Sequence, residues 1–154
     1  MAPEAEERLL RAHAGRRIVV WAATSHASRN RQLIVRPIAD EGMIPMGHHV
    51  WKALGADAYV LAFTSGRGRF GSWRSTPSDL ALPRRGSLED ACLRTGAPAL
   101  FLDLRGSVGP ADWLSKPVLA RPMGHARMVA RWPDVVDGFF FIGTVQPSTE
   151  RGPS

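Results

Sequence analysis

Three short polar segments follow apolar runs of the sequence and hold most of the side chains that could do chemistry. The first contains His26, the second contains Arg67 and Arg69, and the third contains Asp103 and Arg105. In open parallel sheets, functional groups gather just beyond the carboxyl ends of the strands. We therefore expect these three segments to meet at one edge of a sheet.

His26 is the leading candidate for a catalytic residue. Imidazole exchanges protons near neutral pH, so a histidine shortly after a buried strand suits general acid–base catalysis. A solvated loop histidine is the alternative interpretation. Arg67 and Arg69 lie in a Gly-Arg-Gly-Arg stretch that could hold an anionic group of a substrate, and a solvated loop is the alternative there too.

The remaining reactive side chains form no recognisable site in the sequence. His48 and His49 are neighbours and point about 100° apart on a helix, so they do not chelate one metal ion together. His125 stands alone after a glycine, and Cys92 has the position of a core residue on a helix. No Gly-x-Ser-x-Gly motif is present, so a serine nucleophile has no support. Because HExxH and a complete dinucleotide-binding motif are also missing, we expect neither a metal nor a cofactor.

Composition narrows the class of protein. The chain has 154 residues, enough for one domain, and it lacks an apolar run of the roughly 20 residues that a membrane helix needs. One cysteine suits a reducing compartment, which predicts a cytoplasmic protein without membrane contact. The net charge is +6, but the arginines are scattered in ones and twos, so a small nucleic-acid-binding protein is the less favoured alternative.

The order of apolar runs predicts an α/β fold. Helices are expected over Pro3–His13, over Pro45–Leu54 and from Ser87. Three apolar runs without alternation indicate strands buried on both faces and paired in one parallel sheet: Ile18–Ala22, Tyr59–Phe63 and Ala99–Leu104. Further strands are expected at Val118–Arg121 and within Val135–Val145. Alternating helices and strands predict a mostly parallel sheet in a three-layer fold. We expect a single domain at residues 1–147, followed by a disordered tail at residues 148–154.

Six segments, taken in order, resemble the erythromycin esterase family of hydrolases. They are Ile18–His26, Pro45–His49, Phe63–Phe70, Gly86–Glu89, Leu100–Arg105 and Val136–Ile142. The resemblance implies hydrolysis of an ester or of a macrolide lactone, as in resistance to macrolide antibiotics, with His26 at a catalytic position. Glu89 matches a recurring acid of the family, although at the start of a helix it can simply interact with the helix dipole.

The same resemblance implies an incomplete or degenerate member. Family members are longer, and their earlier portion supplies another catalytic histidine and acidic residues. The family has two histidines three positions apart, whereas here Ala23 occupies the first of the two positions. Two alternatives stay open: a hydrolase completed by a separate N-terminal half, and a non-catalytic remnant that binds a ligand. The expected partners are a small ester or macrolide substrate, such a half, or a second copy of the chain.

Overall fold

A computed structural model describes residue 8 and residues 11–13, 15–35, 43–72, 75–106 and 112–149. Its helices are α2 (Thr24–Ala27), α3 (Met46–Leu54) and α4 (Leu88–Arg94). Its strands are β1 (Leu61–Phe70), β2 (Ser78–Asp79), β3 (Ala99–Asp103), β4 (Val118–Met123), β5 (Ala126–Ala130) and β6 (Gly138–Val145). Short 3-10 turns occur at Arg31–Leu33, Gly55–Asp57, Trp113–Ser115 and Trp132–Asp134. Most of the helix predicted at Pro3–His13 and most of the tail lie outside the described residues.

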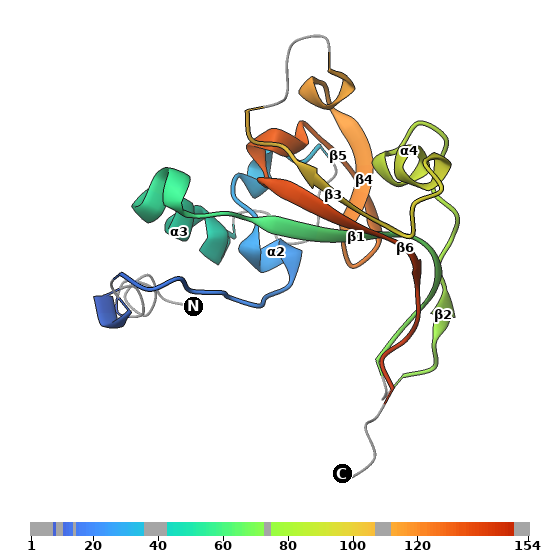
Figure 1. Ribbon diagram of the computed structural model, residues 1–154, viewed down its shortest axis with the longest axis horizontal. Coiled ribbons are helices and arrows are strands. Elements are labelled where there is room, and N and C mark those ends of the chain that lie inside the picture. The colour runs from blue at the N-terminus through green and yellow to red at the C-terminus, as the bar shows by residue number, and fades with distance from the viewer. Residues whose placement is uncertain are drawn as a thin grey trace.

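The main sheet is mixed rather than mostly parallel. Its order is β2-β1-β6-β3, in which β1 pairs parallel with β6, while β3 runs antiparallel to β6 and β2 antiparallel to the end of β1. A separate hairpin joins β4 and β5 (Figure 1). The prediction of a mostly parallel sheet is therefore corrected, because the chain returns from α4 into β3 in the opposite direction to β6.

The predicted strand at Ile18–Ala22 is wrong. This segment has no strand assignment, and the side chains of Val19 and Trp21 are 89% and 84% exposed. Continuous apolarity predicted that this segment is buried on both faces. Burial requires other elements to pack against it, and the described residues do not cover it. Because Ile18–Ala22 is not a strand and β3 runs antiparallel to its neighbour β6, the three predicted runs do not form one parallel sheet.

Most other predicted elements are present. α3, α4, β3 and β6 fall within or close to their predicted ranges, and the hydroxyl of Ser87 caps α4 by accepting a hydrogen bond from the Asp90 amide. β1 begins later than expected and continues to Phe70, so part of the predicted Gly/Arg loop is strand. β5 was not predicted.

The core lies on one face of the main sheet. Ala62, Phe139 and Phe141 point into it and are fully buried beside Leu88 of α4 and Trp132. Figure 1 shows α4 and the β4–β5 hairpin on this side, with α2 and α3 near the start of β1. Within the described part of the chain, no layer covers the opposite face, so the predicted three layers are not borne out.

Candidate functional site

The sheet topology divides the three polar segments between opposite ends of the main sheet. Arg67 and Arg69 lie toward the carboxyl end of β1, whereas Asp103 pairs in register with Gly138 at the amino end of β6. The antiparallel direction of β3 causes this separation. The expectation that all three segments meet at one edge is therefore wrong.

His26 lies exposed on the single-turn helix α2. Ala23 is the N-cap of this helix, and its carbonyl accepts a hydrogen bond from the His26 amide over 2.8 Å. Within the described residues, no hydrogen bond or ion pair joins the His26 side chain to Arg67 or Arg69. An exposed imidazole on a fixed turn is accessible to a substrate, and position 23 lies one helical turn before it.

The chain immediately after α2 is anchored in the interior. Arg29 is 9% exposed; its guanidinium donates a hydrogen bond to the Pro133 carbonyl over 2.8 Å and lies over the Trp51 ring. The Arg29 amide also donates to the Val135 carbonyl over 2.9 Å. These contacts fix α2 against the segment that leads into β6.

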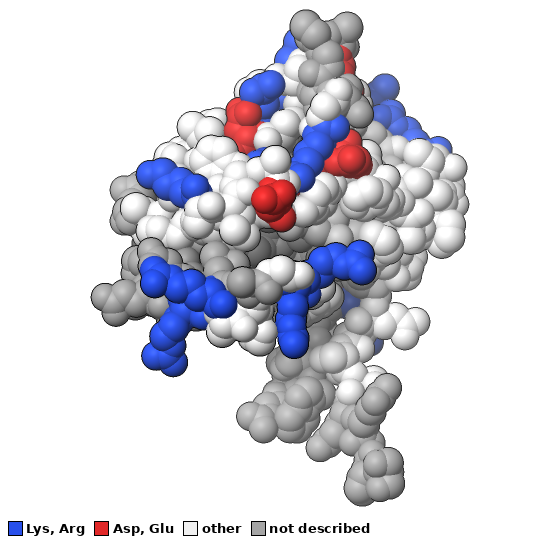
Figure 2. Space-filling model, turned by 60° about the vertical axis from the view of Figure 1, so that its left-hand side comes forward, with Lys and Arg blue, Asp and Glu red and all other residues white. Residues whose placement is uncertain are grey.

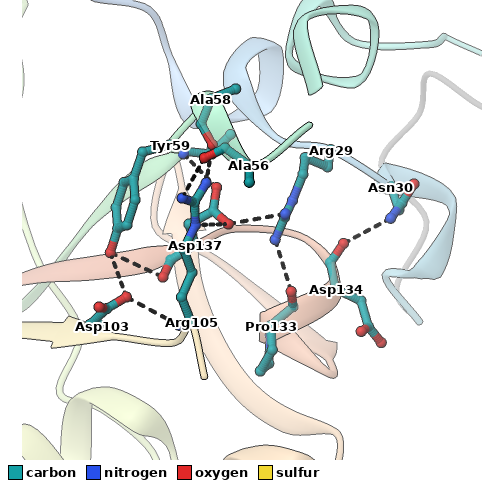
Figure 3. Close-up of polar contacts among 11 residues, drawn as sticks. Arg29, Asn30, Ala56, Ala58, Tyr59, Asp103, Arg105, Pro133, Asp134 and Asp137 are labelled. Atoms are coloured by element: carbon teal, nitrogen blue, oxygen red, sulfur yellow. Dashed lines mark hydrogen bonds and ion pairs between the residues drawn. The ribbon is translucent and has the colours of Figure 1, made fainter. Parts of the chain in front are cut away.

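Asp137 is the centre of this anchor (Figure 3). Its carboxylate, 2% exposed, pairs with Arg29 over 3.0 Å and with Arg105 over 2.8 Å, and it accepts a hydrogen bond from the Val60 amide over 2.7 Å. We call these four residues the Asp137 cluster. Charge-assisted hydrogen bonds of this kind are about twice as strong as neutral ones. One carboxylate thus joins the α2 segment, the start of β1 and the segment after β3.

Tyr59 and Asp103 extend the Asp137 cluster to the surface. The Tyr59 hydroxyl donates to the Asp103 carboxylate over 2.9 Å, and the Arg105 amide donates to the same carboxylate over 3.1 Å. These two donors lower the pKa of Asp103. Burial of the phenol, with its bond to Asp103, raises the pKa of Tyr59 to about 12. Tyr59 is therefore a neutral donor, and Asp103 stays ionised at neutral pH.

A second polar cluster lies on the core side of the sheet. Glu89 is 1% exposed, and one of its carboxylate oxygens accepts hydrogen bonds from the Thr64 hydroxyl over 2.6 Å and from the Arg121 amide over 2.8 Å. Glu89 and Arg121 line a shallow surface indentation, together with Arg84 and Arg127. The sequence indicated a helix-dipole role for Glu89 and missed its burial, because nothing local reveals that Thr64 lies opposite.

The other histidines and the cysteine have packing roles. His125, in a left-handed conformation with φ 62°, packs against Phe70 in a tilted arrangement with ring centroids 4.7 Å apart, and burial lowers its pKa. Burial also lowers the pKa of His48, which lies at a right angle to His49. Cys92 is buried, and its pKa is raised to about 11. Among the described residues, no three metal-ligating side chains lie close enough to hold a metal ion.

The described part of the chain also has no helix that is both long and apolar enough to cross a membrane.

The site therefore consists of an exposed histidine on a turn that a buried ion-pair cluster holds in place. His26 can accept or donate a proton, whereas Asp137 is already engaged by three donors and serves to position its neighbours. The sequence predicted a role for His26 but none for Asp137, since an Asp before a strand carries no sign of its two arginine partners. Arg29 was noticeable only as one of many arginines.

Comparisons with solved structures identify two proteins with a similar fold. No curated protein matches the chain. Among solved structures, a protein from Bacillus cereus is similar, with 16% sequence identity, a TM-score of 0.57 and coverage of 71% of this chain and 30% of the other. A succinoglycan biosynthesis protein is similar with 18% identity, a TM-score of 0.59 and coverage of 81% and 32%. Identities this low establish a shared fold only, and the chain spans about a third of either solved chain.

The family model described as erythromycin esterase matches residues 1–145, nearly the whole chain. This match agrees with the resemblance of the six segments, which extend over the same range. The chain belongs to the erythromycin esterase family.

Proposed function

We propose that this chain is the His26-bearing part of an ester hydrolase that acts on small esters or macrolide lactones and has little activity by itself. The observation that carries the proposal is an exposed imidazole, held on α2 by the anchor between Arg29 and Asp137, in a chain of the erythromycin esterase family. No cofactor or metal takes part in this proposal.

The chemistry sets what His26 can do alone. Hydrolysis of a lactone requires activation of water and protonation of the leaving alkoxide, which are two acid–base tasks. His26 can fill one of them. Position 23, one turn earlier, holds an alanine that can neither transfer a proton nor orient water. We therefore expect the chain to be deficient in one of the two steps.

An ester with a good leaving group separates the two tasks. Nitrophenolate leaves without protonation, so hydrolysis of 4-nitrophenyl acetate needs only the base. We expect His26→Ala to lower this hydrolysis by about 10²-fold, the lower end of what one acid–base group contributes. His49→Ala, which removes a histidine from the neighbouring helix α3, is the matched control and should leave the rate unchanged.

Erythromycin tests the deficiency. We expect no ring opening by the wild-type chain, measured by mass spectrometry as the addition of one water. Ala23→His should increase hydrolysis of esters with poor leaving groups, and a second substitution, His26→Ala, should abolish that gain. Equal 4-nitrophenyl acetate rates in wild type and His26→Ala would refute the assignment. Ring opening by wild type that His26→Ala abolishes would refute the deficiency.

Arg67 and Arg69 stay predictions as substrate-binding residues. Arg69 pairs with Asp79 over 3.3 Å, and Arg67 donates a hydrogen bond to the Thr144 hydroxyl over 3.3 Å. Both lie at the opposite end of the sheet from the Asp137 cluster that anchors α2.

A ligand-binding remnant without catalysis is the second candidate, and Ala23 is the observation that favours it. We place either activity in the cytoplasm, because the chain has a single, buried cysteine.

Nucleic-acid binding has little support from the surface. In Figure 2, basic groups on the visible face are separated by uncharged surface, and no continuous basic stripe crosses it. Sequence-independent binding to nucleic acid depends on several cations that contact neighbouring phosphates together.

A further inference from the structure

The face of the main sheet opposite the core carries a row of aromatic rings. Register places Phe63 of β1 opposite Phe140 of β6, and Phe140 opposite Phe101 of β3. Tyr59 and Trp21 extend the row, with ring centroids 6.4 Å from Phe101 and 5.3 Å from Phe63. We call these five residues the aromatic face.

The aromatic face is open to solvent. Phe63, Phe101 and Tyr59 are 38%, 56% and 42% exposed, whereas Phe139 and Phe141 on the core side are fully buried. A sheet face in contact with water normally carries polar side chains, which alternate with the apolar side chains of the core face. A contiguous exposed apolar area marks a surface that binds another protein or ligand.

Opposite charges lie at the two ends of the aromatic face. Asp103 is two residues beyond Phe101 on β3, and Arg67 is four residues beyond Phe63 on β1, so both side chains lie on the same face as the phenylalanines. Asp103 stays ionised because its two donors lower its pKa. Arg67 is exposed and has no acidic partner among the described residues.

This arrangement is complementary to itself. A two-fold axis in the plane of the face, perpendicular to the line from Asp103 to Arg67, exchanges the two ends. Face-to-face contact around that axis stacks aromatic side chains in the centre and brings each Asp103 to Arg67 of the other copy. Such an arrangement, with an aromatic centre and charges at the rim, is typical of specific interfaces.

We propose that the aromatic face binds a second copy of this chain and forms a two-fold symmetric dimer. The proposal concerns surface residues other than His26, so it can fail without affecting the proposed hydrolase function.

Analytical ultracentrifugation across the micromolar range should show a concentration-dependent equilibrium between monomer and dimer. Phe101→Ser should weaken the dimer by at least about tenfold, as expected for a central aromatic contact. Leu82→Ser changes an apolar side chain that lies outside the aromatic face and is more exposed than Phe101, and it should leave the dimer unchanged.

Charge variants test the orientation of the two copies. Arg67→Glu alone places a second carboxylate against Asp103, and Asp103→Lys alone places a second cation against Arg67, so each variant should dimerise less than wild type. In a heterodimer of the two variants, Asp103 of one copy faces the unchanged Arg67 of the other. The carboxylate introduced at position 67 faces the ammonium introduced at position 103. Both pairs are then attractive, but only if the copies meet head to tail. An equimolar mixture of the two variants should therefore form a heterodimer with near wild-type affinity. Circular dichroism spectra like that of the wild type establish that the variants are folded.

Three results would overturn the proposal. They are a wild-type chain that stays monomeric throughout the micromolar range, a folded Phe101→Ser variant that dimerises like wild type, and charge variants that do not recover on mixing. A monomer that binds a hydrophobic dye would also count against it, because the aromatic face would then be exposed without binding a second copy.

Discussion

Asp137 is the residue on which the position of His26 depends most. Its carboxylate receives Arg29, Arg105 and the Val60 amide from three separate parts of the chain. The charge of Asp137 offsets the cost of burying the Arg29 guanidinium, which is 10% exposed. The turn that carries His26 is thus held in place by an ion pair that does not include His26 itself.

Asp137→Asn should destabilise the fold by about 3 kcal/mol. Removal of one partner of a buried ion pair costs about 3–5 kcal/mol, and the lower value applies because Arg105 remains 35% exposed to water. Urea denaturation measures the free energy of unfolding. Asp79→Asn, which breaks the exposed pair with Arg69, is the control and should cost no more than about 0.5 kcal/mol. Equal stability of the two variants would show that the Asp137 cluster does not anchor the chain.

At the scale of elements, the close contact of α2 with α3 sets the place of the turn that carries His26. Gly47 is buried in α3, and a Cβ atom at this position would lie 1.7 Å from the Ala27 carbonyl oxygen and 2.7 Å from that of Ser28. Only glycine lets the two backbones approach this closely.

Gly47→Ala should therefore separate α2 from α3 and destabilise the fold by about 1–3 kcal/mol, the usual cost of overpacking. The gain in helix propensity from glycine to alanine, up to about 1 kcal/mol, acts in the opposite direction and is smaller than the clash. Thermal unfolding measures the balance, and the NMR signals of the His26 ring should shift. Ala53→Ser, at an exposed position of the same helix, is the control. A Gly47→Ala variant more stable than wild type would show that α2 is free to move.

Sequence patterns predicted individual elements better than their pairing. The helical spacing before Gly55, the Ser87 cap and the apolar runs of β3 and β6 depend on local chemistry, and all four features are present. The direction of β3 depends on the path of the chain after α4, which no local pattern records. His26 could be chosen from residue type and position, whereas Asp137 and Glu89 acquire their roles only from partners far away in the sequence.

At the scale of the whole molecule, one sheet face is packed, and no element of the described residues covers the other. The packed face includes α4, the β4–β5 hairpin and Trp132, whose indole donates a hydrogen bond to the Val118 carbonyl over 2.8 Å. The other side of the sheet carries the aromatic face, where Trp21 contacts Phe63. Trp21 belongs to the segment at residues 18–22, which the sequence predicted to be a buried strand. Apolarity predicted that these surfaces are covered, but it could not indicate whether the covering residues lie in the described part of the chain.

Cys92 reports on the packed half of the molecule. It lies on α4, is 3% exposed, and is the single cysteine of the chain, so every thiol reaction occurs at this site. Its pKa is raised to about 11, chiefly by burial and also by Glu89, so at pH 8 the native thiol is both inaccessible and protonated. We expect Ellman's reagent to react with the native chain only through opening of the core, at a rate at least about 10³-fold below that of the chain unfolded in urea, because thiolate is the reactive form and opening of a core is rare. Cys92→Ala provides the blank. The Asp137→Asn variant should react faster, by about tenfold for each 1.4 kcal/mol of stability lost, if the α2 anchor and the packed core open together. Fast labelling of the native wild-type chain would show that α4 opens independently of the rest of the core.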